Sequence, residues 1–154
     1  MSCGCHQAAG ALIDAAGDDT YVTRSRHTAH AFTWDEATGL LLDEAGDDTY
    51  AGWGNTCGAA AMNGWSVFVD RAGNDTYPSP PPAKAGPNFY HGGSSWGVFI
   101  DAGGGDDSYG KRANDAIHTA PHDSVFMDLP ATVDQALRHD AYRELMARDA
   151  TAAP

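Results

Sequence analysis

The sequence lacks any cluster of lysine or arginine, and its nine basic residues stand against 21 acidic ones for a net charge of −12. Nucleic acids and anionic membranes attract proteins through basic patches, so we expect neither as a partner. No segment approaches the ~20 consecutive apolar residues of a membrane-spanning helix. The acidic excess instead favours divalent cations as partners.

Cysteine is scarce, and the common catalytic fingerprints are missing. Three cysteines, two of them in the pair Cys3-Gly4-Cys5, do not form a disulfide framework. A zinc site of Cys3, Cys5 and His6 is disfavoured, because the remaining thiol, Cys57, lies far along the chain without ligand-like spacing. P-loop, Rossmann, Gly-x-Ser-x-Gly and His-Glu-x-x-His patterns are all absent.

What the sequence contains instead is one phrase repeated along its length. The phrase is a short apolar run, an aspartate, and a Gly-Asp-Asp or Gly-Asn-Asp turn closed by Thr or Ser and Tyr. Four complete copies and a truncated fifth read LIDAAGDDTY, LLLDEAGDDTY, VFVDRAGNDTY, VFIDAGGGDDSY and VFMDLP. Their first aspartates are Asp14, Asp43, Asp70, Asp101 and Asp128, at intervals of 29, 27, 31 and 27 residues. Recurrence at this length indicates stacked repeats.

The repeat predicts three short strands in each unit. The apolar run before each first aspartate is one strand, and the tyrosine after each turn begins a second. A third, weaker strand is expected around Ala29–Trp34, Cys57–Met62 and Phe89–Trp96. We therefore predict an all-β fold, a parallel β-solenoid (β-helix) of about four to five coils of ~28 residues, stacked ~4.8 Å apart with like residues above like. A hairpin sheet or a propeller is the competing interpretation.

Two segments depart from the repeat. The proline-rich stretch from Pro78 to Pro87 cannot form a central strand, so we expect a loop bulging from the third coil. In the tail, Thr132 and Gln135 fit a capping box, and an apolar stripe predicts a capping α-helix over roughly Val133–Arg148. The expected organisation is a solenoid domain at residues 1–130 and a capping helix and tail at residues 131–154. The N-terminal coil has no comparable cover, which fits self-association there or a fragment of a longer array.

The turn Ala72-Gly73-Asn74-Asp75-Thr76-Tyr77 and its relatives at 16–21 and 45–50 resemble part of the glycine-rich nonapeptide of repeats-in-toxin (RTX) proteins. In that family the pattern Gly-Gly-x-Gly-x-Asp-x-(large apolar residue) binds Ca²⁺ between the coils of a parallel β-roll. The resemblance implies a ligand role for the aspartate before Thr or Ser: Asp19, Asp48, Asp75 and Asp107. Here the period is about 28 residues instead of nine, and the leading glycine pair is absent. The phrase also resembles GDD-x-Y repeats of bacterial solenoid-type proteins, which imply no activity.

In-register stacking would gather the acids into two columns. The strand-end column contains Asp14, Asp43, Asp70, Asp101 and Asp128, and the turn column contains Asp19, Asp48, Asp75 and Asp107. Carboxylates ~4.8 Å apart repel by roughly 3–4 kcal/mol at an effective dielectric constant near ~20. Raised pKa values, solvent or a hard cation such as Ca²⁺ must compensate, so all nine aspartates are candidate metal ligands.

The alternative for the strand-end column is an Asx-turn, in which each aspartate accepts a hydrogen bond from the backbone amide two residues on. We favour this structural role for the strand-end column and a metal role for the turn column. Asn74 replaces one middle aspartate of the turn, whereas the last aspartate persists in all four complete copies.

The sequence favours a non-catalytic, calcium-binding β-solenoid module with a structural, adhesive or surface role. Such a role would suit an extracellular or cell-surface location, although no secretory signal is seen at the start of the sequence. The alternative is a carbohydrate-active parallel β-helix enzyme, a polysaccharide lyase or hydrolase, whose site would need a non-repeated cluster such as His91, His118, His122 and Asp123. Trp65 and Trp96 both lie five residues before their aspartate, which predicts a stacked core or corner ladder rather than a sugar-binding face.

Overall fold

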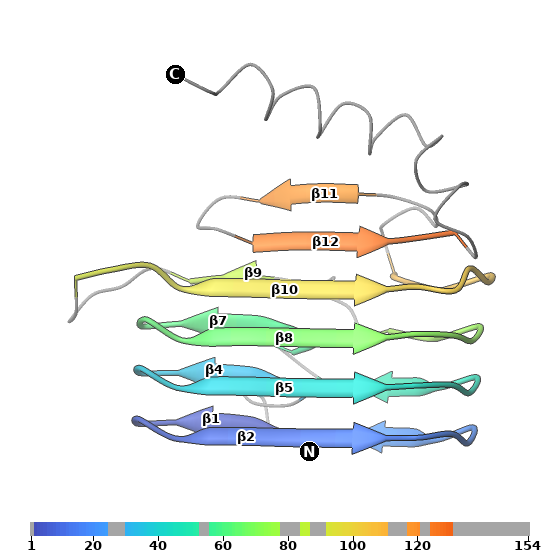
Figure 1. Cartoon of the computed structure of the whole chain (residues 1–154), viewed down its shortest axis with the longest axis horizontal. Coiled ribbons are helices and arrows are strands. Elements are labelled where there is room, and N and C mark those ends of the chain that lie inside the picture. Colours follow the sequence, from blue (N-terminus) through green and yellow to red (C-terminus); the bar gives the residue numbers. More distant parts are fainter. Residues whose placement is uncertain are drawn as a thin grey trace.

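The computed structural model describes residues 2–24, 30–52, 56–77, 84–86, 92–110, 117–120 and 124–130. In these segments the chain is an all-β parallel solenoid, with one long strand per coil stacked over the next (Figure 1). Every strand pair in the described part is parallel except β11 with β12. Parallel pairing confirms the solenoid and excludes a sheet of hairpins. The predicted tail helix lies outside the described residues.

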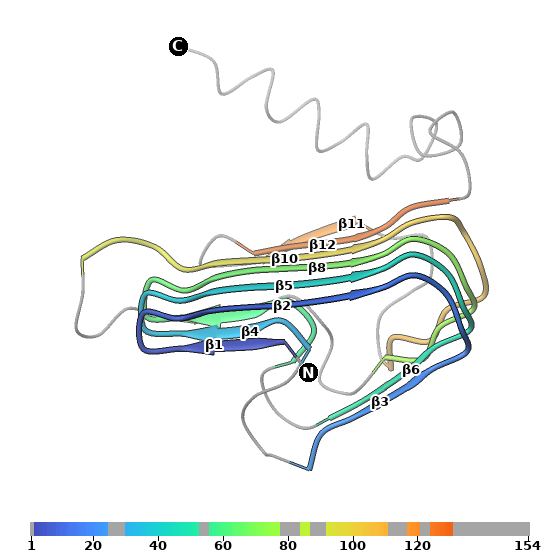
Figure 2. The ribbon, with the colours of Figure 1, turned by 60° about the horizontal axis from the view of Figure 1, so that its bottom comes forward.

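Three sheets form the sides of the solenoid, in the strand orders β1-β4-β7-β9, β2-β5-β8-β10-β12-β11 and β3-β6. Figure 2 shows the long strands nested over one another, with β1 and β4 on one side and β3 and β6 on another. The strands are β1 (Cys3–Cys5), β2 (Ala9–Asp14), β3 (Thr20–Val22), β4 (Phe32–Trp34), β5 (Thr38–Asp43), β6 (Thr49–Ala51), β7 (Ala59–Ala61), β8 (Trp65–Asp70), β9 (Lys84–Ala85), β10 (Trp96–Asp101), β11 (Ile117–Ala120) and β12 (Ser124–Asp128). The described part has no helix, and hence none long and apolar enough to cross a membrane.

About three coils are complete, fewer than the four to five expected. The first two coils contain three strands each, and the third contains β7, β8 and a bridge from Thr76 to Thr49. Beyond them, the sides are continued only in part: β9 has two residues and borders residues outside the described segments, β10 continues the long side, Ser108 forms a bridge to Thr76, and β12 extends the long side alone. The expected number was too high because the repeated phrase counts long strands rather than closed coils.

The strand expected around Phe89–Trp96 is not found in its described part, residues 92–95, and its beginning lies outside the described residues. The structure instead has β9 at Lys84–Ala85, inside the stretch that we expected to be a loop, where it pairs in parallel with β7. These two residues follow the prolines and have the backbone donors that a ladder needs. Trp96 belongs to the following long strand, β10.

The long strands superpose in register, so like residues lie over like. Asp14 pairs with Asp43, Asp43 with Asp70, Asp70 with Asp101, and Asp101 with Asp128. Side chains alternate between the two faces, and the inward positions contain Leu41, Phe68, Phe99 and Phe126, each at most 1 % exposed. The rings of Phe68 and Phe99 stack at 4.9 Å between centroids, and those of Phe99 and Phe126 at 5.1 Å.

A tyrosine ladder faces this apolar column from the other side of each turn. Tyr21, Tyr50, Tyr77 and Tyr109 stack with centroid distances of 4.9, 5.2 and 4.9 Å and interplanar angles of 7° or less. The tyrosines also meet the phenylalanine rings edge to face, as Tyr77 does with Phe99 at 88°. Both arrangements are favourable for aromatic rings. The core therefore confirms the prediction that like residues lie above like.

Trp65 and Trp96 are equivalent, as predicted, but they do not lie in the core. They pair in register, with ring centroids 5.9 Å apart, and their exposed fractions are 58 % and 44 %. Both point away from the core because five residues, an odd number, separate each of them from an inward aspartate, and strand residues alternate between faces.

The turn glycines permit the close approach of successive coils. A Cβ added to Gly73 would overlap the carbonyl oxygen of Gly46 and lie 2.7 Å from Asp75 Oδ1. Gly46 stands in the same relation to the carbonyl oxygen of Gly17. Because the sheets fix the spacing of the coils, neither backbone can move aside without loss of register.

Replacement of Gly73 by alanine should therefore destabilise the protein, by about 1–3 kcal/mol in the free energy of unfolding, the usual cost of overpacking. The measurement is urea denaturation. Gly92→Ala is the matched control, because a Cβ there meets no atom within 4 Å. Equal losses in the two variants would contradict the role given to the close coil contact.

Candidate metal centre

The two columns of aspartates converge where the long strands end. Carboxylate oxygens from successive coils lie within 4.8 Å of one another in three groups. The groups are Asp43, Asp48 and Asp70; Asp70, Asp75 and Asp101; and Asp101, Asp107 and Asp128. Each group takes one turn-column aspartate and two strand-end aspartates, so neighbouring groups share Asp70 or Asp101. Seven of the nine predicted residues are thus brought together.

The remaining two predicted residues, Asp14 and Asp19, belong to the first coil and to none of these groups. Both are half-buried, whereas their equivalents in the second coil, Asp43 and Asp48, are each 1 % exposed. The difference arises because no described coil covers the first one.

Tyrosine hydroxyls contact the strand-end column along its length. The Tyr50 hydroxyl lies 3.2 Å from Asp43 Oδ2 and 2.9 Å from Asp70 Oδ2. The Tyr77 hydroxyl lies 3.0 Å from Asp70 Oδ2 and 2.6 Å from Asp101 Oδ2. Tyr21 bridges Asp14 and Asp43 in the same way. Each of these three tyrosines thus joins the aspartate of its own coil to that of the next, and the Tyr109 hydroxyl contacts Asp101 of its own coil.

When every aspartate is ionised, these contacts contain fewer donor protons than acceptor oxygens. A tyrosine hydroxyl has one proton to donate, yet each bridging hydroxyl lies between two carboxylate oxygens. Burial, and then the charges of Asp70 and Asp43, raise the pKa of Tyr50 well above its usual range, so its proton stays in place. The second contact of each bridging hydroxyl is satisfied only if one of its carboxyl groups is itself protonated.

The turn column has a different set of hydrogen bonds. The backbone amide of Asp48 donates to Asp75 Oδ1, and that of Asp75 donates to Asp107 Oδ1, both at 2.7 Å. The amide of Asp19 donates to Asp48 Oδ1 at the same distance. One carboxylate oxygen in each of Asp48, Asp75 and Asp107 is therefore occupied by the backbone of the preceding coil.

Four buried carboxylate oxygens in these groups have no hydrogen-bond partner: Asp43 Oδ1, Asp48 Oδ2, Asp70 Oδ1 and Asp75 Oδ2. The four residues are at most 1 % exposed, so solvent does not compensate. The two ion pairs within the described residues, Arg71 with Glu44 and His6 with Asp35, lie elsewhere. A buried polar atom without a partner costs about 1–3 kcal/mol, and more if it is charged.

The local environment strongly favours the protonated form of these acids. Burial is the largest cause, and repulsion from neighbouring aspartates adds to it, while hydrogen bonds to the carboxylates partly oppose it. The pKa is raised to about 6 in Asp70, about 7 in Asp48, about 8 in Asp75 and about 9 in Asp101. Protons and a cation are therefore alternative ways to neutralise the same carboxylates.

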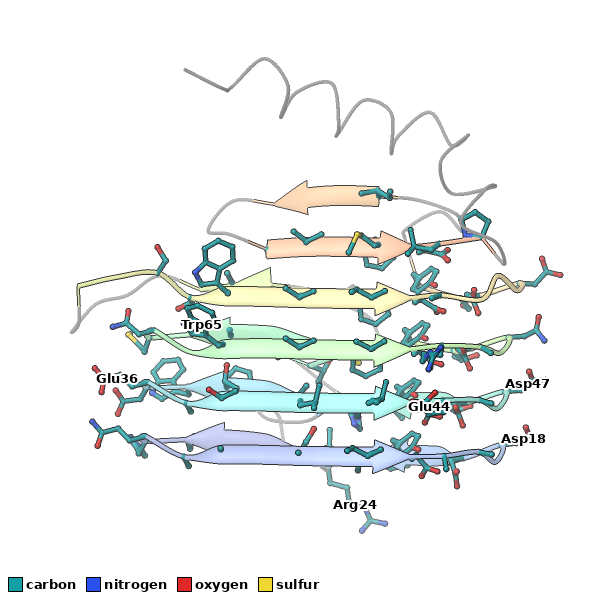
Figure 3. The ribbon with its side chains drawn as sticks, in the orientation of Figure 1. Asp18, Arg24, Glu36, Glu44, Asp47 and Trp65 are labelled. Carbon is teal, nitrogen blue, oxygen red and sulfur yellow. The ribbon has the colours of Figure 1, made fainter. Side chains whose placement is uncertain are left out.

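The middle residue of each turn has another role. Asp18 and Asp47 lie at the outer tips of the turns (Figure 3). Asp47 Oδ1 accepts hydrogen bonds from the backbone amide and side-chain amide of Asn74, at 2.9 and 3.1 Å. Asn74 Oδ1 in turn accepts one from the Asp106 amide. Since this position needs an acceptor oxygen but no charge, asparagine replaces aspartate there.

The other candidates gain no support from the described residues. His6 Nδ1 lies 2.6 Å from Asp35 Oδ2, but no potential metal group found there contains Cys3, Cys5 or His6. Of the Asx-turn bonds expected for the strand-end column, the Ala16 amide donates to Asp14 Oδ1 at 3.4 Å, and the Ala72 backbone, two residues after Asp70, lies close enough to that carboxyl to lower its pKa against the larger effect of burial. The side chains of the proposed enzymatic cluster, His91, His118, His122 and Asp123, lie outside the described residues.

Sequence reasoning missed the tyrosine hydroxyls as part of the site. The signal was the constant separation of seven residues between Asp14 and Tyr21, Asp43 and Tyr50, and Asp70 and Tyr77. Seven residues around one tight turn return the hydroxyl to the strand end.

Comparison with known proteins adds no relative: no family model, no curated protein and no solved structure matches the chain. The likeness to RTX turns therefore depends on the turn residues alone.

The raised pKa values predict the pH dependence of stability in a chelator. An aspartate with an unfolded pKa of about 3.9 binds more protons in the folded state once its folded pKa is higher, so stability falls as the pH rises between the two values. We expect the melting temperature to fall from about pH 4 to about pH 9. Asp70→Asn should flatten this dependence, whereas Asp47→Asn at the exposed middle position should not. A melting temperature that rises across the window would contradict the assignment.

Loss of one buried hydroxyl should also be measurable. Tyr77→Phe removes a partner from both Asp70 and Asp101, so the free energy of unfolding should fall by about 1–3 kcal/mol in urea. Tyr21→Phe is the matched variant in the half-buried first coil and should cost less, because water reaches Asp14 there. A loss in Tyr21→Phe as large as that in Tyr77→Phe would count against a buried tyrosine–aspartate network.

Proposed function

We propose that the chain is a non-catalytic, calcium-binding β-solenoid module with a structural, adhesive or surface role, in which Ca²⁺ neutralises the two columns of aspartates. The observation that carries the proposal is the set of four buried carboxylate oxygens without partners, grouped between successive coils. A cation would replace the missing partners and the missing positive charge at once.

The ligand chemistry favours calcium over transition metals. The three groups offer carboxylate oxygens and include no thiol or imidazole, and hard cations prefer oxygen ligands. Calcium–oxygen distances of about 2.3–2.6 Å place two ligands of one ion up to about 5 Å apart. The 4.8 Å limit within each group is compatible with that span. Backbone carbonyls or water would complete the coordination.

The charges suggest how many ions bind. The three groups contain seven different aspartates, and three divalent cations would supply six positive charges. Asp70 and Asp101 each belong to two groups and would bridge neighbouring ions. We therefore expect up to three ions per chain, in a row that follows the stacking direction.

The same features argue for a structural role rather than catalysis. The acids recur with the coil, and the four with unpartnered oxygens are almost fully buried, so a substrate has no access to them. An ion bound there would tie each coil to the next. Calcium would therefore act on the stability of the fold.

The test compares melting temperatures in millimolar Ca²⁺ and in chelator at neutral pH. A ligand that binds only the folded state should raise the melting temperature by about 5–10 °C at ~100 times its Kd. Asp48→Asn keeps an acceptor for the Asp19 amide but removes one buried charge, so it should lose part of this shift. Asp47→Asn removes the same charge from the exposed tip and should keep most of it.

Terbium luminescence provides a readout that does not depend on stability. Tb³⁺ takes the same oxygen ligands as Ca²⁺, and the tyrosine hydroxyls touch the proposed ligands, so excitation of tyrosine should sensitise Tb³⁺ emission. Added Ca²⁺ should displace the signal, and Mg²⁺ should do so less well because it demands smaller, octahedral sites. An unchanged melting temperature together with no competed emission would refute calcium binding.

A further inference from the structure

The long strands are apolar on both faces. Their outward residues form an outer face on β2, β5, β8, β10 and β12, in which Thr38 is the one polar side chain and none is charged. The exposed fraction reaches 68 % at Ile13 and 58 % at Trp65, and it is 37 % at Val67. No described segment crosses this face in Figure 1, and Trp65 is seen on it in Figure 3.

Such a composition is unusual for a sheet that faces water on one side. Strands of that kind alternate apolar and polar residues, whereas runs such as Val67-Phe68-Val69 and Val98-Phe99-Ile100 are typical of sheets covered on both faces. Contiguous apolar patches of a few hundred Å² or more mark interaction sites. The inward residues of each run pack in the core. The outward residues need another apolar surface to pack against.

We propose that the outer face packs against the same face of a second copy of this chain. The face has no charge with which to select a polar or ionic partner, so its partner must present a flat, apolar surface. The rows of side chains on this face, one on each long strand, repeat at the coil spacing of ~4.8 Å. A second copy has rows with the same spacing. Sheets that pack face to face interlock their side chains in this way.

The area fits a weak dimer. Four of the five strands, ~4.8 Å apart, have three outward residues ~6.8 Å apart and β12 has two, so the face covers roughly 460 Å². Two such faces would bury about 900 Å² in total, in the size range of weak, transient interfaces. We therefore expect a reversible dimer with a dissociation constant in the micromolar range or weaker.

The charge distribution is compatible with close approach of two copies in spite of the net charge. Asp18 and Asp47 lie at the turn tips, and the Arg71–Glu44 ion pair, at 2.6 Å, lies just beyond the strand ends. An uncharged centre with a charged rim is the usual anatomy of a protein interface. An anionic membrane, by contrast, would be repelled by the acidic rim.

The test is sedimentation velocity of the full chain from about 5 µM to about 500 µM, a range that brackets a micromolar dimer. The weight-average mass should rise toward that of two chains. Val67→Asp places a charge at the centre of the outer face and should abolish the rise. Val22→Asp is the matched control, because Val22 is 53 % exposed on β3, away from this face, and it should keep the wild-type behaviour. Trp65→Gln, at a more exposed position, should weaken association at least tenfold without loss of the fold.

Three results would overturn the proposal. One is a wild-type chain that stays monomeric up to the highest concentration, whether the face is then covered by another part of the chain or by a different partner. Another is a Val67→Asp variant that associates as the wild type does. The third is an equal loss of association in Val67→Asp and Val22→Asp. Sedimentation in Ca²⁺ and in chelator distinguishes this proposal from calcium binding. The outer face contains no proposed calcium ligand, so its association does not depend on the outcome of the calcium test.

Discussion

In-register stacking is the constraint on which the rest of this structure depends. Because one coil lies directly over the next, the aspartates, the tyrosines and most apolar side chains have a chemical equivalent as neighbour. This is favourable for Phe68, Phe99 and Phe126, whose rings stack, and for the tyrosine ladder. It is unfavourable for the aspartates, which meet like charges at the same spacing. The register that builds the core therefore also creates the electrostatic cost that tyrosine hydroxyls, backbone amides, protons or a cation must offset.

Much of this arrangement was predictable because the period of the sequence repeat is the length of one stacked coil. The intervals between Asp14, Asp43 and Asp70 predicted the parallel strands and the aspartate columns, with like residues above like. The position of β9 was not predictable, since Lys84–Ala85 has no apolar run and follows several prolines. The paired hydroxyl contacts depend on the path of the turn in three dimensions. The outward position of Trp65 was available in the sequence, through its odd separation from Asp70.

The long strands also divide polar and apolar character in an unusual way. Most small sheets place polar residues on the face that meets water, whereas here charge is displaced to the strand ends and turns. The buried acids of the three aspartate groups and the exposed acids at the turn tips belong to the same corner of each coil. Most of the acidic side chains of the repeat thus lie at one corner of each coil, whereas the faces of the long sheet are apolar.

The antiparallel pair of β11 and β12, the one such pair among the described residues, has a consequence for how such a molecule changes in length. β11 runs against β12 and so does not present the next coil position with the parallel template that β5, β8 and β10 offer one another. We therefore expect a repeat to be added or removed more readily between parallel coils, such as those of β5 and β8, than next to β11. Each such rearrangement would lengthen or shorten the stack by one coil.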